Sequence, residues 1–99
     1  MNALSLARYY GVCVLFADLG DWGKAELRSE YDPRIPAIRI NARVALHFTD
    51  EALREFVTLA VGHELYHHRE RIGETPNVAD AREREVRADR YARRLLDRA

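Results

Sequence analysis

Two histidines and a glutamate stand at a spacing that is typical of metal-dependent hydrolysis. His63 and His67 are four residues apart and Glu64 follows the first of them, so the segment fits the pattern H-E-x-x-H. On a helix, residues four apart lie ~40° apart around the axis, and both imidazoles can therefore bind one metal ion. Glu64 projects in another direction, within reach of a water on that metal. The pattern predicts a zinc site with Glu64 as its acid/base.

A zinc ion in a catalytic site takes three protein ligands and keeps a fourth position open. No third histidine stands at the downstream spacing of the elongated H-E-x-x-H-x-x-G-x-x-H motif, so we expect the third ligand in the last helix. There Glu85 lies in an alanine-rich stripe, an unusual place for an unpaired carboxylate. Asp89, four residues further on, suits the free ring N–H of a ligand histidine. The alternative is a solvated carboxylate face paired with arginines of the same helix.

The helices that must position these residues are visible in the second half of the chain. Thr49 is the expected N-cap of a helix whose apolar stripe extends to about Arg71. A break is expected over residues 73–77, which include a glycine and a proline. A last helix is then expected over residues 80–98. Its predicted inner stripe consists of Ala81, Glu85, Ala88, Ala92 and Leu95 or Leu96.

The first half begins with a short helix and an apolar run. Residues 2–10 carry apolar side chains at near-helical spacing, and Gly11 ends the expected helix. Residues 12–19 are β-branched and apolar, as in a strand that is covered on both faces. Cys13, inside this run, is expected to be a small core residue.

Two further strands are expected before the metal-binding helix. Residues 25–31 alternate, with Ser29 and Tyr31 on the same face, which indicates a half-exposed strand. Residues 37–40 form a third short strand, whose start Pro36 places at an edge or outside the ladder. Turns are expected at residues 20–23 and 32–34.

Length and composition limit the classes of protein to consider. The 99 residues form one domain, 1–99, and the order helix, three strands, helix, helix predicts an α+β fold. The 16 basic and 16 acidic side chains cancel, so we expect no nucleic-acid or membrane partner recruited by net charge. One cysteine excludes an intramolecular disulfide. The longest apolar run is too short to span a membrane and no secretory leader is visible, so a cytoplasmic protein is expected.

Two motifs together resemble a known family. Residues 63–67 followed by residues 85–89, which read Glu-Val-Arg-Ala-Asp, are similar to the H-E-x-x-H and E-x-x-A-D motifs of gluzincin metallopeptidases of the ImmA/IrrE-like group. The resemblance covers nearly the whole chain. It implies a minimal zincin-like fold in which the last helix bears the third zinc ligand. It also implies a zinc-dependent endopeptidase, often acting on a helix-turn-helix repressor, with ligands His63, His67 and Glu85 and with Glu64 as acid/base.

One departure from the group leaves other hypotheses open. Tyr66 stands where the group usually has a glycine or another small residue, and it could crowd the cleft beside the metal. The chain could then be a zinc-stabilised regulatory or binding module without turnover. A third hypothesis is a latent enzyme, silenced by self-association or by a terminal segment.

A transition-state oxyanion would need a donor besides zinc, and the sequence does not choose one. His68 is expected to be solvated rather than a ligand, because it points about 100° away from His67. The candidate donors are Tyr31, Tyr66, Tyr91 and His68.

Overall fold

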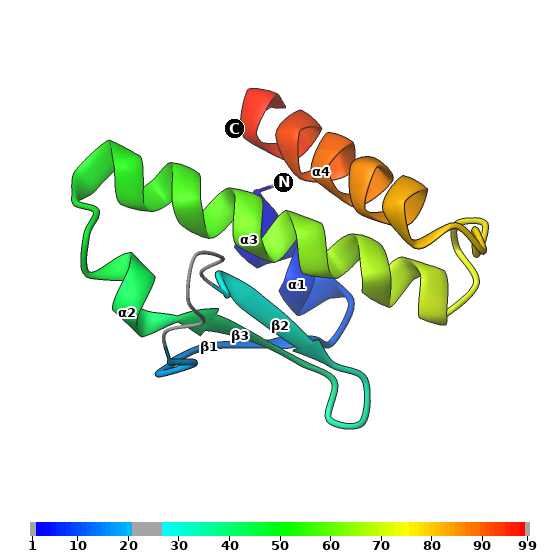
Figure 1. The fold of residues 1–99 in the computed structure, drawn as a ribbon, viewed down its shortest axis with the longest axis horizontal. Helices are drawn as coiled ribbons and strands as arrows, with labels where there is room; N and C mark the ends of the chain where they lie inside the picture. Colours follow the sequence, from blue (N-terminus) through cyan, green and yellow to red (C-terminus); the bar gives the residue numbers. More distant parts are fainter. Residues whose placement is uncertain (1, 21–26, 99) are drawn as a thin grey trace.

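The computed structural model describes residues 2–20 and 27–98 and has three layers (Figure 1). A small sheet forms the first layer, α1 and α3 cover one face of it, and α4 packs on α3 away from the sheet. This is the expected α+β class, with one short helix, α2, that the sequence pattern did not indicate. The helices are α1 (Ala3–Tyr9), α2 (Ala42–Ala45), α3 (Asp50–Arg71) and α4 (Ala81–Arg98).

The sheet is mixed, and its strand order is β1-β3-β2. The central strand β3 pairs in parallel with β1, with Phe16 opposite Ile40, and antiparallel with β2, with Tyr31 opposite Ile38. Ile38 and Ile40 are fully buried under α3 and α1. Pro36 precedes the ladder, as expected. The strands are β1 (Cys13–Ala17), β2 (Ser29–Asp32) and β3 (Ala37–Asn41).

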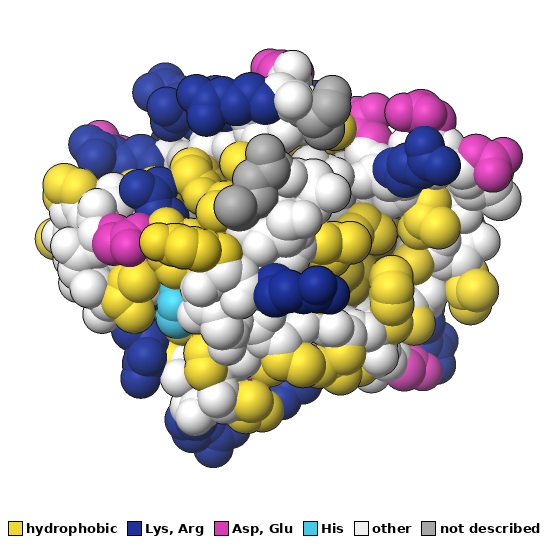
Figure 2. Space-filling model, turned by 180° about the vertical axis from the view of Figure 1, so that it is seen from behind, with side chains coloured by type: hydrophobic (Ala, Val, Ile, Leu, Met, Phe, Trp, Pro, Cys, Tyr) yellow, Lys and Arg dark blue, Asp and Glu magenta, His cyan; other side chains and the backbone are white. Residues whose placement is uncertain are grey.

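The first strand differs from the prediction in length and in burial. It is shorter than residues 12–19 and lies at an edge, with one neighbouring strand. Cys13 is exposed rather than in the core, and Phe16 is 54% exposed. Figure 2, which looks onto the side of α1 and β1, shows apolar side chains at this surface. A short apolar run does not distinguish a strand buried on both faces from an edge strand, which explains the error.

The second strand begins later than predicted. β2 starts at Ser29, and it continues through Asp32, a residue of the predicted turn. The predicted residues 25–26, and the predicted turn at 21–23, lie outside the described residues. Ser29 and Tyr31 share the face toward α3, as the alternation predicts.

The two long helices begin and end close to the predicted residues. Thr49 is the N-cap residue of α3, although its side chain makes no capping hydrogen bond. The Asp80 carboxylate accepts from the backbone N–H groups of two residues in the first turn of α4. No helix in the described ranges is both long enough and apolar enough to cross a membrane.

The helices α3 and α4 approach each other closely at Gly62. A Cβ atom at Gly62 would lie 2.8 Å from the Ala92 Cα and 2.9 Å from its Cβ. The stripe of α4 that faces α3 consists of Ala88, Ala92 and Leu95, whereas Ala81 and Glu85 are exposed. The predicted stripe was therefore wrong at its first two positions, because the helix pair makes its buried contacts further along α4.

Candidate metal centre

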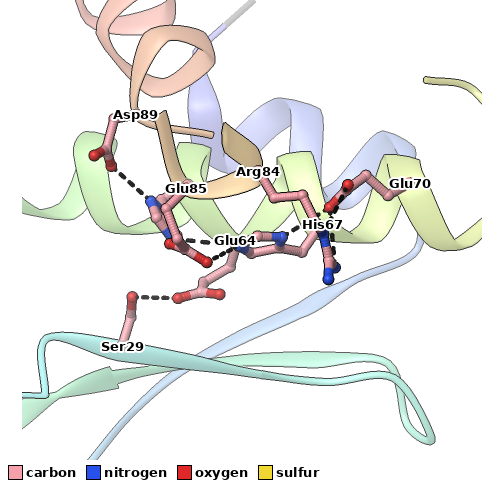
Figure 3. Close-up of polar contacts among 8 residues, drawn as sticks. Ser29, Glu64, His67, Glu70, Arg84, Glu85 and Asp89 are labelled. Atoms are coloured by element: carbon pink, nitrogen blue, oxygen red, sulfur yellow. Dashed lines mark hydrogen bonds and ion pairs between the residues drawn. The ribbon is translucent and has the colours of Figure 1, made fainter. Parts of the chain in front are cut away.

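Three side chains from α3 and α4 place their ligand atoms around one point. The Nε2 atoms of His63 and His67 are 3.3 Å apart, one helical turn separating the residues. Glu85 reaches across from α4, with Oε2 2.8 Å from His63 Nε2 and Oε1 3.3 Å from His67 Nε2 (Figure 3). All three ligand atoms lie within 4.8 Å of one another. The structure thus brings together the three residues that the motifs singled out.

The Nδ1 atom of each imidazole is hydrogen-bonded to a carboxylate. His63 Nδ1 lies 2.8 Å from Asp89 Oδ1, and His67 Nδ1 lies 2.9 Å from Glu70 Oε1. An Nδ1–H that donates to a carboxylate leaves the Nε2 lone pair free for a metal. Asp89 has the place expected for it. Glu70 was missed, although its i+3 spacing from His67 puts it on the same helix face.

Glu70 is the buried member of an ion pair between the two helices, and its partner Arg84 is half-exposed. Arg84 on α4 donates from Nε to Glu70 Oε2 at 3.1 Å and from Nη2 to Glu70 Oε1 at 3.4 Å. Burial raises the pKa of Glu70, but the hydrogen bonds from His67 and Arg84 and the charge of Arg84 outweigh burial and hold this pKa below its usual value. Sequence spacing could not reveal Arg84, because its partner lies on another helix.

The Glu64 carboxylate lies on the sheet side of the two imidazoles. The residue as a whole is 7% exposed, and Ser29 Oγ on β2 donates to the Glu64 Oε2 at 2.7 Å (Figure 3). Both residues line a cleft of about 540 Å³ between β2, α3 and α4. Its other polar lining residues are Arg28, His63, Asp89 and Arg93, and its apolar ones are Phe56, Leu59, Ala60 and Ala92.

Glu85 lies beside the two histidines as expected, but it is not buried as expected. Its side chain is 57% exposed, so it is not a carboxylate buried in an alanine stripe. Glu85 is a candidate ligand because it lies close to both imidazoles, and not because it is desolvated. The alternative, a solvated carboxylate face paired with arginines, is right about exposure, since Glu85 and Asp89 are both exposed, but these two carboxylates contact histidines.

None of the four candidate oxyanion donors lines this cleft. The Tyr31 hydroxyl lies 2.6 Å from His68 Nδ1, between β2 and α3. His68 is buried, not solvated, and burial lowers its pKa. Tyr66 and Tyr91 line a separate groove of about 720 Å³. The charged and polar groups that do line this cleft include Arg28, Ser29 and Arg93, none of which was expected there.

The donor set fits zinc. Two imidazole nitrogens and one carboxylate oxygen are ligands that Zn²⁺ accepts, and a set of three leaves one position open for substrate or water. The carboxylates on both Nδ1 atoms are the outer partners that such ligands require.

Comparison of the chain with protein-family models, with curated proteins and with solved structures found no match.

Proposed function

We propose that this chain is a zinc-dependent endopeptidase domain of the gluzincin type, similar to the ImmA/IrrE-like group, with a minimal zincin-like fold. One observation carries the proposal. The ligand atoms of His63, His67 and Glu85 converge within 4.8 Å, next to the buried carboxylate of Glu64. Two motifs that are separated in sequence thus meet at one site, in the roles that peptide hydrolysis needs.

His63, His67 and Glu85 would hold the zinc. When bound, zinc would supply Lewis-acid polarisation of the scissile carbonyl and acidification of the attacking water. Asp89 and Glu70 keep the two imidazoles in the tautomer that presents Nε2 to the metal.

Glu64 moves the proton. Its carboxylate takes a proton from the attacking water and passes it to the amine nitrogen that leaves when the peptide C–N bond breaks. Ser29 donates to Oε2 and fixes the carboxylate, which leaves Oε1 as the proton acceptor. Burial beside Phe56 and Ala60 keeps this group in a partly apolar cleft.

An extended peptide is the substrate that suits this cleft. Strand β2 lies at an edge of the sheet and contributes Ser29 to the cleft lining. A peptide added along this edge would gain main-chain hydrogen bonds while its carbonyl reaches the metal ligands. The substrate class is therefore a protein or peptide, for which the resemblance suggests a transcriptional repressor.

The hypothesis of a binding module without turnover depended on Tyr66 crowding the cleft. The Tyr66 ring is 5% exposed, packs near Tyr91 with ring centroids 6.1 Å apart, and lines the other groove. Tyr66 therefore does not line the cleft that contains Glu64, although its ring also lies 6.1 Å from that of His67, and crowding of this cleft no longer supports the binding module.

Cleavage of an unfolded protein tests the proposal. The zinc-loaded wild type is expected to cut it at defined bonds, and a chelator is expected to stop the reaction. Glu64→Gln is expected to keep zinc and lose cleavage, since an amide cannot relay a proton, while the exposed Glu83→Gln serves as a matched control with full activity. A Glu64→Gln protein that cleaves at the wild-type rate would refute this mechanism. A zinc-loaded wild type that cuts nothing would support the binding module or the latent enzyme, which a self-association measurement separates.

A further inference from the structure

Two charged side chains, Arg84 and Glu70, link α4 to the imidazole of His67 in the candidate metal centre. Arg84 binds both carboxylate oxygens of Glu70, and Glu70 Oε1 in turn accepts from His67 Nδ1 at 2.9 Å. The Glu70 side chain is 3% exposed, whereas Asp89, which has the equivalent place on His63, is 74% exposed. Figure 3 shows the two carboxylates on either side of the Glu85 side chain.

Because of this difference in burial, removal of Glu70 should cost more than removal of Asp89. Water can replace an exposed acceptor such as Asp89 with little loss, because the ring N–H then donates to solvent. Glu70 has no such replacement, since a buried N–H without an acceptor is costly. Removal of Glu70 also leaves the Arg84 guanidinium without its carboxylate.

The same ion pair also positions the third ligand. The buried side chains of α4 begin at Ala88, so the first two turns, which carry Glu85, have few apolar contacts with α3. Arg84 is the residue before Glu85, and its bond to Glu70 attaches this part of α4 to α3.

We propose that Glu70 and Arg84 are positioning residues of the metal centre. Glu70 fixes the His67 tautomer that leaves Nε2 unprotonated, and Arg84 holds α4 at the distance from which Glu85 reaches both imidazoles. This inference rests on the proposed zinc site. It adds that zinc binding depends on Glu70 and Arg84, which lie outside the two ligand motifs.

Paired truncations test it with two readouts, zinc affinity by chelator competition and the His67 tautomer by ¹⁵N NMR of the metal-free protein. Glu70→Ala is expected to lower zinc affinity roughly 10–100-fold and to replace a single Nδ1–H tautomer by a mixture. Asp89→Ala, the matched control, is expected to lower affinity less and to leave His67 unchanged. Arg84→Gln is expected to weaken zinc binding, and with Glu70→Ala the losses should not add, since both belong to one network.

The outcomes separate this inference from the proposed function. If the wild type binds zinc and Glu70→Ala changes neither readout, the inference is wrong while the zinc site stands. If the wild type does not bind zinc, the proposed function fails, and the tautomer in metal-free protein still decides whether Glu70 orients His67. Should Glu70→Ala not fold, Arg84→Gln at the half-exposed position decides through the same readouts. Wild-type zinc affinity in folded Arg84→Gln would overturn the role of this arginine.

Discussion

Four carboxylates surround the two imidazoles, and their surroundings assign them different tasks. Glu85 is exposed and lies near both Nε2 atoms, which suits a metal ligand at the solvent-accessible side of the site. Asp89 and Glu70 accept from the Nδ1 atoms, one from the surface and one from the interior. Glu64 contacts neither ring nitrogen and binds Ser29 instead, so its carboxylate remains available for proton transfer. In the proposed site, location rather than residue type thus separates the metal ligand, the acceptors that orient the imidazoles and the base.

Glu85→Ala is expected to weaken zinc binding strongly, because it removes one of three protein ligands. Glu83→Ala, two residues earlier on the same helix, is the control and should bind zinc as the wild type does, since Glu83 pairs with Arg87. Isothermal titration with zinc compares the two variants. Equal affinity for wild type and Glu85→Ala would place the third ligand elsewhere.

At the scale of elements, the close contact of α3 and α4 determines whether Glu85 can reach the histidines. Gly62→Ala is expected to destabilise the protein by about 1 kcal/mol, because overpacking costs about 1–3 kcal/mol and the gain in helix propensity is about 1 kcal/mol. The added Cβ would meet Ala92 at 2.8 Å, so α4 must shift, and zinc affinity should fall as well.

Gly11→Ala is the matched control for this prediction. Gly11 has a φ of +70° and nothing near its missing Cβ, so alanine there is strained but does not displace α4. Urea unfolding should show a loss of stability for both variants, and zinc titration should show a loss of affinity for Gly62→Ala alone. A Gly62→Ala protein with unchanged zinc affinity would show that the helix contact does not position Glu85.

The hairpin of β2 and β3 contains a carboxylate whose ionisation contributes to stability. Hydrogen bonds from the Arg34 side chain and backbone, with a further one from Arg39, hold the pKa of Asp32 at about 2. A pKa lowered by folding means that the ionised form stabilises the native state above the ordinary pKa, and that this contribution is lost as the pH falls from about 4 to about 2.

Asp32→Asn should therefore unfold at lower urea concentration than the wild type at pH 7, and the gap should close as the pH falls to about 2. Asp97→Asn, at an exposed position near the end of α4, serves as the control for a general change of charge. A gap between Asp32→Asn and wild type that stays constant from pH 7 to pH 2 would contradict the argument.

For the whole molecule, zinc binding should couple to folding. The three proposed ligands come from two helices, so an unfolded chain does not hold them together. At a free zinc concentration 100 times the dissociation constant, binding adds about 2.7 kcal/mol to stability. For a domain of this size that raises the melting temperature by roughly 10–20 °C. Calorimetry with zinc and with chelator measures the difference, and Glu85→Ala should lose most of it. A wild-type melting temperature that does not respond to zinc would count against the site.

Local patterns predicted the helices and the ligand pair better than the strands. Helical spacing located α1, α3 and α4 to within a few residues, and the i,i+4 spacing placed His63 and His67 side by side. The run at residues 12–19 was misread because periodicity does not show how many neighbours a strand has. The environment of Glu85 was misread because the sequence does not show how α4 packs on α3, including the close approach of Ala92 to Gly62.

The sequence by itself determined the relative directions of the proposed ligands His63 and His67 and the proposed base Glu64, because residues within a turn of one helix keep fixed directions in any fold. Only the tertiary structure decided which distant groups complete the site: Ser29 from β2 on Glu64, and Arg84 from α4 on Glu70. It also places the four candidate oxyanion donors outside the cleft lining, namely Tyr31, Tyr66, Tyr91 and His68. The reason is physical, since contacts between elements depend on how their apolar faces pack together, and local spacing carries no information about that packing.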